Sequence, residues 1–559
     1  MNMAVTIVSN SNLEITFRTD SFQVVSINNK QTGRFILRDG SHRMKVRTHL
    51  ETFEPYFLNV LKKVSKNKNA IVFHCTDEKS IYRAQLSVQV NNDSIEFHMK
   101  ITGKRPVWLV EWELSPLDCG EMIIPALGGQ SLSSEMPAGA SLTYKYPFWW
   151  NAQMVIGSQA GGGVWLYTRD AEPSFKLLRI KKQTDGFGIV YGFETDAQSD
   201  TSQFDVTWYI DGYRGSWKNP VDIHRRWMES AFNLKPYNRH PHYPKWMDDI
   251  NFILEMWGIG NESPDPQHTF DDMKTRLREW RKLHHPSKTL VYLPGFAERG
   301  IDSRAPDYNP SDKLGGEKKF GELTAYARKL GYRVMIHTNI LAMTFTNPLY
   351  EKFKRYQVVD VFGRKLGWGL DMDGDWLAEP YFAYMNPGYK AWGEHMQNVL
   401  GNLITKYKLD GVFLDQTLLA FNVKKGPNFN KGMRSHVERL QRAFPDVLFG
   451  GEGINDYILP ALPYVQIHGI DSIGEVHALD GQTSWRHAHP VSTYLMRKYT
   501  RFGAHLLTKH PSSPFFKLQE DAYERLNVIP ALVLYHRKQK MDSPEVRRML
   551  KRAKSLNSK

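Results

Sequence analysis

Two short apolar segments of the chain each end on a carboxylic acid, and together these acids could do acid–base chemistry. Residues 407–417 read YKLDGVFLDQT and residues 447–456 read VLFGGEGIND, with Asp415 and Glu452 at the ends of the apolar runs. Glycoside hydrolysis needs two carboxylates that flank the scissile bond, one as nucleophile or base and the other as general acid. We therefore predict that Asp415 is a nucleophile and Glu452 an acid/base.

The surroundings of the two acids favour these roles. Glu452 stands in GGEG, where small neighbours would let a substrate approach closely and desolvate the carboxyl group. Desolvation raises the pKa of a carboxyl group, as a proton donor requires. Asp415 follows a buried-looking strand that would hold a nucleophile in place. The alternative is structural: Asp415 could cap a helix or form a salt bridge, and Asp410, which opens the same strand, is interpreted as structural.

The elements that must hold these acids are predicted to form a barrel. From residue 249 onward, short apolar segments rich in β-branched or aromatic residues alternate with helical segments. Strict alternation of this kind predicts a parallel sheet covered by helices. Six strands are plain, and 501–508 and 527–535 are candidates for a seventh and an eighth, so we expect a (β/α)8 TIM barrel. The predicted helices include 270–283, 317–331, 389–407 and 431–444.

The first part of the chain has a different rhythm. Residues 1–235 contain short alternating segments such as LEITF, FQVVSI and SIEFHMKI, separated by turn-forming NN, DG and NND. Period-two alternation with almost no helical signal predicts an antiparallel β-sandwich. The chain is thus expected to run from this sandwich through a linker over 236–248 to the catalytic barrel over 249–545. The basic residues 546–559 are expected to form a C-terminal tail.

Polar residues at several strand ends are predicted to converge on one face of the barrel. In such barrels the active site lies at the carboxyl ends of the strands. One polar residue at a strand end is unremarkable, but several at successive ends indicate a site. Aromatic rings are added as candidates for stacking on sugars. The predicted substrate-binding residues are Glu255, Trp257, His337, Asn339, Trp368, Asp371, Asp373, Tyr381, Gln416, His468, Asp471 and Glu475.

Other chemistries lack their sequence signatures. No GxSxG, HExxH or Walker sequence occurs. The loop DMDGDW (371–376) lacks the glycine and glutamate of a calcium loop, and we interpret it as an acidic loop over the barrel. His487 and His489 are interpreted as a surface or substrate-contacting pair rather than metal ligands. We therefore predict no metal and no cofactor.

Composition restricts the partners. The formal net charge is +14, but the basic residues are scattered and no nucleic-acid motif accompanies them. No apolar run is long enough to span a membrane, and Cys75 and Cys119 cannot form a disulfide framework. We expect a carbohydrate partner, no nucleic acid and no membrane, with the oligomeric state open. No signal peptide is visible, so a cytoplasmic location is expected unless a signal was removed.

The stretch MNPGYKAWGEHMQNVLGNLITKYKLDGVFLDQ (385–416) resembles glycoside hydrolases whose nucleophilic aspartate ends the fourth barrel strand. That group includes α-amylase-like and endo-α-N-acetylgalactosaminidase-like enzymes, in which a glutamate ending the fifth strand is the acid/base. The resemblance implies these roles for Asp415 and Glu452, and a galactose-mutarotase-like sandwich ahead of the barrel. Phe413 stands where α-amylase-like enzymes have an arginine. The candidates for a third, transition-state-stabilising carboxylate are Asp471, Glu475 and Asp480.

The sequence therefore predicts a retaining α-glycosidase. Retention would bring the two carboxyl groups to about 5–5.5 Å, whereas inversion would need about 6.5–9.5 Å. Two alternatives remain: a carbohydrate-binding barrel that has lost catalysis, and a metal-dependent TIM-barrel hydrolase that uses the histidines.

Overall fold

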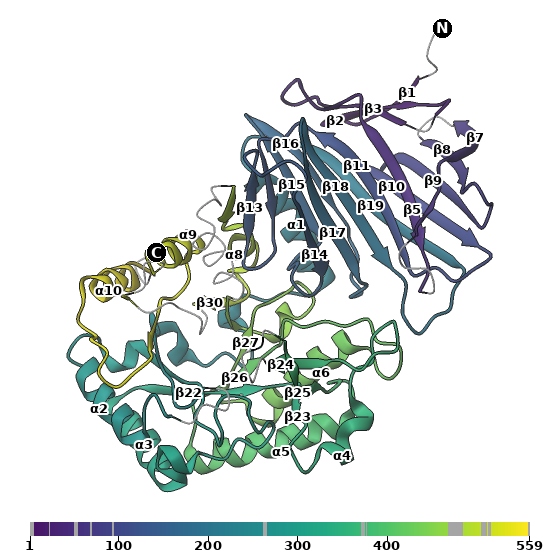
Figure 1. Cartoon of the computed structure of the whole chain (residues 1–559). Coiled ribbons are helices and arrows are strands. Elements are labelled where there is room, and N and C mark those ends of the chain that lie inside the picture. Colours follow the sequence, from purple (N-terminus) through teal and green to yellow (C-terminus); the bar gives the residue numbers. More distant parts are fainter. Residues whose placement is uncertain are drawn as a thin grey trace. The chain divides into compact units, whose positions relative to one another are not determined.

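Figure 1 shows the computed structural model of the chain, in which two compact units are distinct. One unit comprises Met1–Phe232 and Leu479–Leu495, and the other comprises Asn233–Ala478 and Met496–Lys559. The structure describes residues 5–21, 23–49, 54–66, 70–91, 94–260, 265–370, 375, 377–467, 485–504, 511–512 and 516–556.

The first unit is built from three antiparallel sheets. The four-stranded sheet contains, in spatial order, β1 (Val5–Ser9), β2 (Leu13–Arg18), β3 (Gln23–Asn29) and β4 (Arg34–Arg38). The ten-stranded sheet contains β29 (Arg486–Ala488), β13 (Gln130–Ser133), β12 (Glu121–Ile124), β15 (Met154–Gln159), β16 (Gly162–Tyr167), β19 (Gln203–Arg214), β10 (Ser94–Gly103), β9 (Tyr82–Asn91), β8 (Ala70–Thr76) and β7 (Val60–Lys66). The six-stranded sheet contains β14 (Ser141–Tyr146), β17 (Lys176–Gln183), β18 (Gly186–Glu194), β11 (Leu109–Leu117), β5 (Ser41–Arg47) and β6 (Tyr56–Phe57).

The two larger sheets share one apolar core. Trp112 of the six-stranded sheet packs on Phe97 and Trp208 of the ten-stranded sheet, with ring centroids 5.4 and 5.3 Å apart. β10 and much of β19 bury every second side chain, because successive side chains of a strand point to opposite faces, whereas nearly all residues of β11 are buried. The predicted antiparallel β-sandwich is therefore confirmed. Helix α1 (Lys218–Ala231) follows β19.

One strand of the first unit comes from late in the sequence. β29 pairs antiparallel with β13, so that Gln130 lies opposite Ala488. The sequence had assigned this segment to the barrel range 249–545, which is wrong for β29 because the free edge of β13 takes it as a neighbour. His487 lies in β29 and His489 directly follows it, so this histidine pair belongs to the first unit.

The second unit is a parallel eight-stranded barrel. Backbone hydrogen bonds from Ile529 N to Phe502 O and from Ala504 N to Ile529 O, both 2.9 Å, join the two edge strands. The predicted (β/α)8 barrel is confirmed. Its strands are, in spatial order, β30 (Arg501–Gly503), β28 (Tyr464–Gln466), β27 (Leu448–Glu452), β26 (Gly411–Asp415), β22 (Arg333–Asn339), β21 (Thr289–Leu293), β20 (Phe252–Met256) and β31 (Ala531–Leu534).

Helices lie outside the barrel strands, as α2, α3 and α5 do in Figure 1. Helix α2 begins with a capping box, in which the side chains of Thr269 and Asp272 each accept a hydrogen bond from the other residue's backbone N–H group. Besides α1, the α-helices in the described part of the chain are α2 (Phe270–Trp280), α3 (Gly316–Leu330), α4 (Tyr350–Phe353), α5 (Lys390–Tyr407), α6 (Phe429–Ala443), α8 (Val491–Met496), α9 (Phe516–Leu526) and α10 (Pro544–Leu556).

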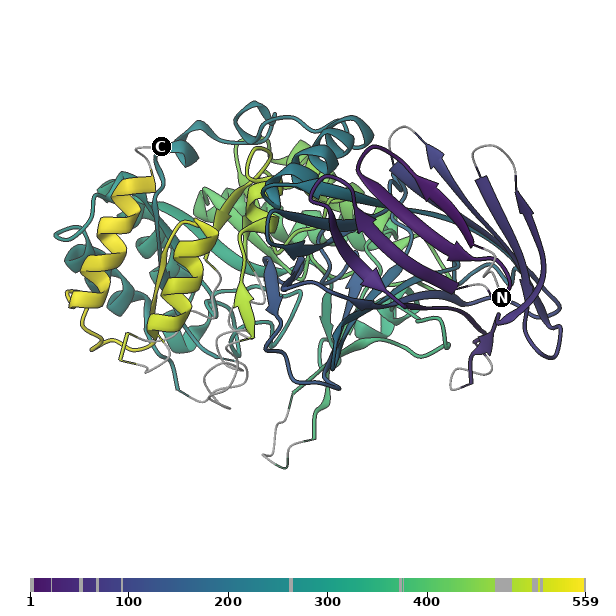
Figure 2. The same cartoon turned by 90° about the horizontal axis from the view of Figure 1, so that it is seen from above.

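The basic C-terminal residues form an amphipathic helix, α10. Val546, Met549 and Ala553 of α10 are buried, which puts its basic residues on the other face. α9 and α10 lie side by side, yellow in Figure 2, and Arg552 pairs with Glu520 at 3.3 Å. The expected basic C-terminal segment is thus a helix in its described residues, which end at residue 556.

A small antiparallel sheet is inserted between β22 and β26. It consists of β23 (Ala342–Thr344), β25 (Glu379–Tyr384) and β24 (Gly367–Leu370), in that spatial order. None of the helices that the structure describes has the length and apolar character needed to cross a membrane.

Candidate active site

Three neighbouring barrel strands end at one level on polar side chains. Asn339 of β22 pairs in register with Asp415 of β26, and the register between β26 and β27 brings Glu452 next to Asp415. Side chains at equivalent positions of neighbouring parallel strands point the same way. The carboxyl ends of the barrel strands, here called the mouth, therefore hold the acid pair that the sequence singled out.

The two carboxyl groups interact directly. Glu452 is close enough for a hydrogen bond between its side chain and that of Asp415, and Gln416 N donates to Glu452 Oε2 at 2.7 Å. Asn339 Nδ2 donates to Asp415 Oδ2 at 3.2 Å. Burial, together with the charges of Glu452 and Asp302, raises the pKa of Asp415 well above its ordinary value. The pair can therefore retain a proton at neutral pH.

Gly450 and Gly451, which precede Glu452, stand where the surrounding residues leave no room for a side chain. A Cβ on Gly451 would lie 2.6 Å from a methyl group of Leu462 and 2.7 Å from Thr417 Oγ1. A Cβ on Gly450 would lie 2.7 Å from the ring of Tyr464. For Gly450 and Gly451 the expectation of room for a substrate is wrong, because protein atoms already fill that room; for Gly453 it stays a prediction.

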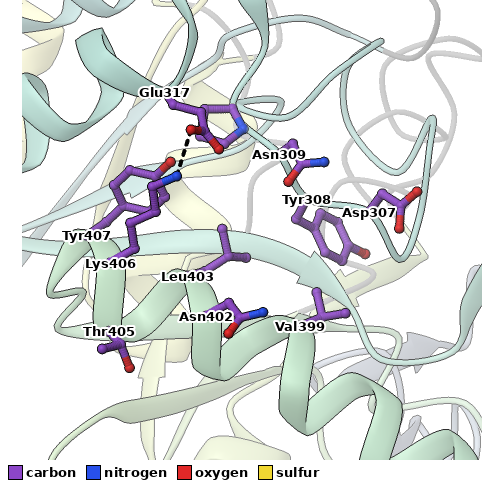
Figure 3. Close-up of a pocket in the computed structure, with 11 residues that line it drawn as sticks. Asp307, Tyr308, Asn309, Glu317, Val399, Asn402, Leu403, Thr405, Lys406 and Tyr407 are labelled. Carbon is purple, nitrogen blue, oxygen red and sulfur yellow. Dashed lines mark hydrogen bonds and ion pairs between the residues drawn. The ribbon is translucent and has the colours of Figure 1, made fainter.

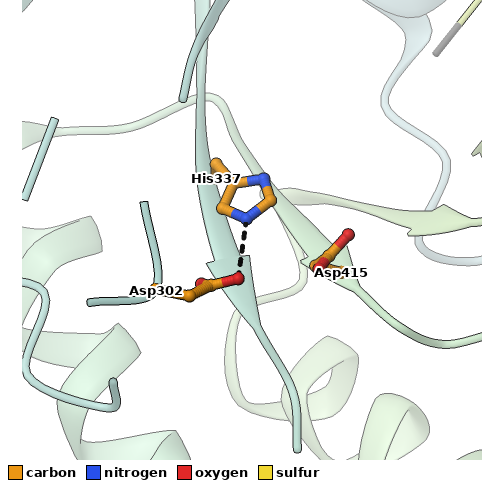
Figure 4. Close-up of side chains that lie close together, drawn as sticks. All are labelled: Asp302, His337 and Asp415. Carbon is orange, nitrogen blue, oxygen red and sulfur yellow. Dashed lines mark ion pairs between the residues drawn. The ribbon is translucent and has the colours of Figure 1, made fainter. Parts of the chain in front are cut away.

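Asp302 joins the acid pair, and the sequence reasoning missed it. It lies in the loop after β21, is 7% exposed and has a positive φ of 53°. Asn339 Nδ2 donates to its Oδ2 at 3.3 Å, and His337 Nε2 lies 3.5 Å from the same oxygen. Figure 4 shows His337, Asp302 and Asp415 gathered at the strand ends. One ligand atom from each lies within 4.8 Å of the others, so these three residues could hold a metal ion.

Tyrosine hydroxyl groups support the polar side chains at the mouth. Tyr292 of β21 shares a hydrogen bond of 2.6 Å with His337 Nδ1. The hydroxyl of Tyr308 accepts from Asn339 N at 2.7 Å and donates to Asp302 at 3.4 Å. Burial raises the pKa of both tyrosines well above its ordinary value, so both remain neutral. A sequence alone gives no signal for Tyr292, because it stands in the apolar run TLVYL.

Glu255 and Trp257 form a separate pair at the end of β20. Glu255 is fully buried, and its Oε1 accepts a hydrogen bond of 2.6 Å from Trp257 Nε1. Burial raises the pKa of Glu255 to about 8, and the indole hydrogen bond only partly opposes this rise. The predicted sugar-binding role of Trp257 is thus limited to its ring, because its N–H group is already used.

Trp368 and Tyr381 lie on the inserted sheet. Trp368 is 40% exposed and pairs across the strands with Phe382, their rings 5.4 Å apart. Phe382 contacts Tyr384 at 5.7 Å, and Tyr384 lies beside Gln416 and the two carboxylates, whose charges help to raise its pKa. Tyr381 is buried. Of the aromatic residues that are predicted to bind sugar and that the structure describes, Trp368 is the exposed one. The series Trp368–Phe382–Tyr384 connects its ring to the acid pair of Asp415 and Glu452.

Several predicted residues cannot be placed. Asp371 and Asp373 lie outside the described residues, as do His468, Asp471 and Glu475 beyond the sixth strand. They remain predictions. The last residue of β28, Gln466, is fully buried and reaches Tyr464 OH with its Nε2 at 3.4 Å.

A cavity of about 590 Å³ lies away from the mouth, between the loop at 307–310 and helices α3 and α5. Its walls are mixed in polarity, and the ion pair of Lys406 and Glu317, 2.6 Å, closes one side (Figure 3). Tyr308 lines this cavity with its ring while its hydroxyl bonds to Asn339 and Asp302. Because it contains neither acid of the pair, we do not assign it to catalysis.

Sequence comparison gives a match to a family model over part of the chain. No curated protein matches the chain. A family model described as a domain of unknown function (DUF6259) matches residues 203–462, less than half of the chain.

Solved structures show where the fold recurs. The α-N-acetylgalactosaminidase NagBb from Bifidobacterium bifidum, in complex with Gal-NHAc-DNJ, has a TM-score of 0.77 at 11% identity, with 99% of this chain and 93% of that chain covered. The galactosidase domain of the α-galactosidase-sucrose kinase AgaSK has a TM-score of 0.51 at 11% identity, with 100% and 85% covered. The GH36 α-galactosidase AgaA from Geobacillus stearothermophilus has a TM-score of 0.50 at 10% identity, with 99% and 86% covered.

These likenesses show the fold. The predicted combination of an antiparallel sandwich and a (β/α)8 barrel is confirmed. The finer resemblances to α-amylase-like barrels and to a galactose-mutarotase-like sandwich stay predictions. The chain therefore shares its fold with α-N-acetylgalactosaminidase and α-galactosidase structures at 10–11% identity.

Proposed function

We propose that this protein is a retaining glycosidase that hydrolyses α-linked N-acetylgalactosaminides or α-galactosides. The observation that best supports this is the pair of Asp415 and Glu452 on adjacent strand ends, within hydrogen-bonding reach of each other. Carboxyl groups on adjacent strand ends fit the short spacing of about 5–5.5 Å in retaining enzymes better than the spacing of about 6.5–9.5 Å with which inverting enzymes admit a water molecule.

In the proposed reaction, Asp415 attacks the anomeric carbon while Glu452 gives its proton to the oxygen of the departing group. A covalent glycosyl-enzyme forms, and the bond to the aglycone breaks. Glu452 then takes a proton from water, whose oxygen attacks the anomeric carbon and releases Asp415. The amide of Asn339 donates to Asp415 Oδ2, which favours the ionised form but does not outweigh the burial and the neighbouring carboxyl groups that raise the pKa of Asp415. The reaction therefore requires that the proton shared by the pair lie on Glu452 when Asp415 attacks.

The polar lining of the mouth suits a ligand with many hydroxyl groups. Within the described part of the chain, buried oxygen or nitrogen atoms at the ends of four strands have no hydrogen-bond partner. Buried polar groups are normally satisfied, so these atoms point to a polar ligand. They are Glu255 Oε2, His337 Nε2, Gln416 Oε1 and Gln466 Oε1.

The choice of sugar follows the names of the proteins that share the fold. NagBb is named an α-N-acetylgalactosaminidase, and AgaSK and AgaA are named α-galactosidases. We therefore propose the nitrophenyl α-glycosides of these two sugars as first substrates. Asp415→Asn and Glu452→Gln should each lower kcat/KM at least about a hundredfold, because each removes a catalytic group. Asp446→Asn, an exposed acid just before β27, serves as the matched control and should keep full activity.

Azide separates the two roles. With Asp415→Ala, azide should give a glycosyl azide of inverted configuration, because azide replaces the nucleophile. With Glu452→Ala, azide should attack the glycosyl-enzyme and give the retained configuration. The opposite pairing would exchange the roles. If neither variant lowers turnover of an α-glycoside that the wild type cleaves, the assignment of catalysis to Asp415 and Glu452 is wrong. If the wild type cleaves no α-glycoside, the enzyme proposal itself is wrong and a carbohydrate-binding barrel is the better interpretation.

A further inference from the structure

We propose that Asp302, His337 and Asp415 form a binding site for a divalent transition-metal cation of the zinc class, at which the cation excludes the sugar substrate. One ligand atom from each of the three side chains lies within 4.8 Å of the other two. Figure 4 shows the imidazole of His337 and both carboxylates facing a common space at the strand ends. Small rotations would bring the three atoms to the roughly 2.0–2.2 Å at which imidazole and carboxylate ligands bind Zn²⁺.

The donor set fits this class of cation. One imidazole nitrogen and two carboxylate oxygens suit Zn²⁺, Mn²⁺ and related ions, whereas Mg²⁺ and Ca²⁺ prefer sites made only of oxygen. The three ligands come from β22, β26 and the loop after β21, so the barrel holds two of them on rigid strand ends. Three protein ligands would leave a fourth position for water.

A second observation points to a ligand at the same place. His337 is only 2% exposed, and its Nε2 makes no hydrogen bond within the described part of the chain. That atom faces Asp302 Oδ2 at 3.5 Å without hydrogen-bond geometry. Tyr292 OH lies 2.6 Å from the other ring nitrogen, Nδ1. In the tautomer in which Nδ1–H donates to this hydroxyl oxygen, the contact would orient the ring as outer contacts orient metal-binding histidines, with Nε2 as the ligating atom.

The charges around the site also favour a cation. Asp302, Asp415 and Glu452 bring three carboxyl groups together in a buried place. Among the described residues, the side chains that contact Asp302 and Asp415 are those of Tyr308, Asn339, His337 and Glu452, and none of them has a fixed positive charge. Buried carboxylates are stable when they are paired or coordinate a metal.

Occupation of this site would block the proposed reaction. A cation bound to Asp415 would hold the electron pair that must attack the anomeric carbon. It would also stand where the sugar approaches. Competitive inhibition by the cation rests on the proposed function, but binding of the cation does not.

The test is a titration of Zn²⁺ into the full chain, from which metal has first been removed with a chelator. Titration calorimetry measures the binding with no sugar present. His337→Ala and the milder Asp302→Asn should each abolish one Zn²⁺ site. Tyr292→Phe should weaken it about 10- to 100-fold, as loss of an outer contact does at other metal sites. His240 and His242, whose rings are 5.8 Å apart, could bind zinc independently of the mouth. The matched control is therefore His242→Ala, which removes one histidine of this second pair. This control should keep the site at the mouth.

The possible outcomes distinguish failure of the proposed metal site from failure of the proposed glycosidase function. If His337→Ala and Asp302→Asn bind as much zinc as the wild type, or an anomalous-scattering peak lies elsewhere, the metal site is refuted. If zinc binds here and raises KM for the α-glycoside without changing kcat, the site and the competition are both supported. If zinc binds here but stimulates turnover, the competition is wrong. A wild-type protein that binds zinc here and cleaves no glycoside refutes only the proposed function.

Discussion

Replacing Glu255 with glutamine should stabilise the protein in a way that depends on pH. The glutamate is fully buried at the end of β20, and burial raises its pKa from an ordinary 4.5 to about 8. Glutamine has the same shape and keeps an oxygen that can accept the hydrogen bond from Trp257 Nε1. Glu255→Gln therefore removes an ionisable group and little else.

The size of the effect follows from proton linkage. An acid whose pKa rises on folding destabilises the folded state above its unfolded pKa, because only the unfolded chain can ionise freely. Stability should fall as the pH rises from about 4.5, and the loss should level off near pH 8, where folded Glu255 also ionises. At pH 7 the cost is about 3 kcal/mol, since each pH unit contributes about 1.36 kcal/mol.

Calorimetric unfolding of the wild type and of Glu255→Gln at about pH 5 and pH 7.5 would measure this. The variant should unfold at a clearly higher temperature at the upper pH and at nearly the same temperature at the lower pH. Glu394→Gln, an exposed acid on α5, is the control and should show no such dependence. A variant that is no more stable than the wild type at the upper pH would refute the reasoning. So would a gain of equal size at both pH values.

Two further predictions concern packing and support at the mouth. Gly451→Ala should lower the free energy of unfolding by about 1–3 kcal/mol, because its Cβ would meet Thr417 Oγ1 at 2.7 Å; Gly321→Ala, whose nearest contact is 4.0 Å, should not. Urea unfolding compares the two, and equal losses would contradict the packing argument. Tyr308→Phe leaves the buried N–H group of Asn339 without its 2.7 Å partner, which should cost about 1–3 kcal/mol of stability and lower kcat more than it changes KM. Unchanged kcat would show that this hydroxyl does not help to position the acid pair.

The barrel could be predicted from the sequence because its signals are local. Apolar runs such as that ending at Asp415 are short and separated by amphipathic segments, and the helix expected over 389–407 is observed as Lys390–Tyr407. Where a strand ends on an acid, the parallel arrangement then determines that neighbouring acids meet. Asp415 and Glu452 can be paired in this way from the sequence alone.

The rest of the site depends on folding that a single sequence does not reveal. Asp302 lies in a loop whose course is set by tertiary contacts, a few positions beyond Glu298 and Arg299, the first polar residues after the strand. Glu298 instead pairs with Arg304 at 3.5 Å. Tyr292 reads as a core residue, and its hydroxyl becomes informative only when His337 is found 2.6 Å away.

The pairing of β29 with β13 has a consequence for how the chain is made and cut. The sheet edge formed by β13 at residues 130–133 must wait for residues 486–488, so the first unit is incomplete until most of the chain has left the ribosome. Exposed strand edges invite pairing with other chains. A fragment that stops at residue 232 would therefore expose this edge and tend to aggregate. No single cut separates the units, and an isolated barrel is better made by replacing the excursion around β29 with a short loop.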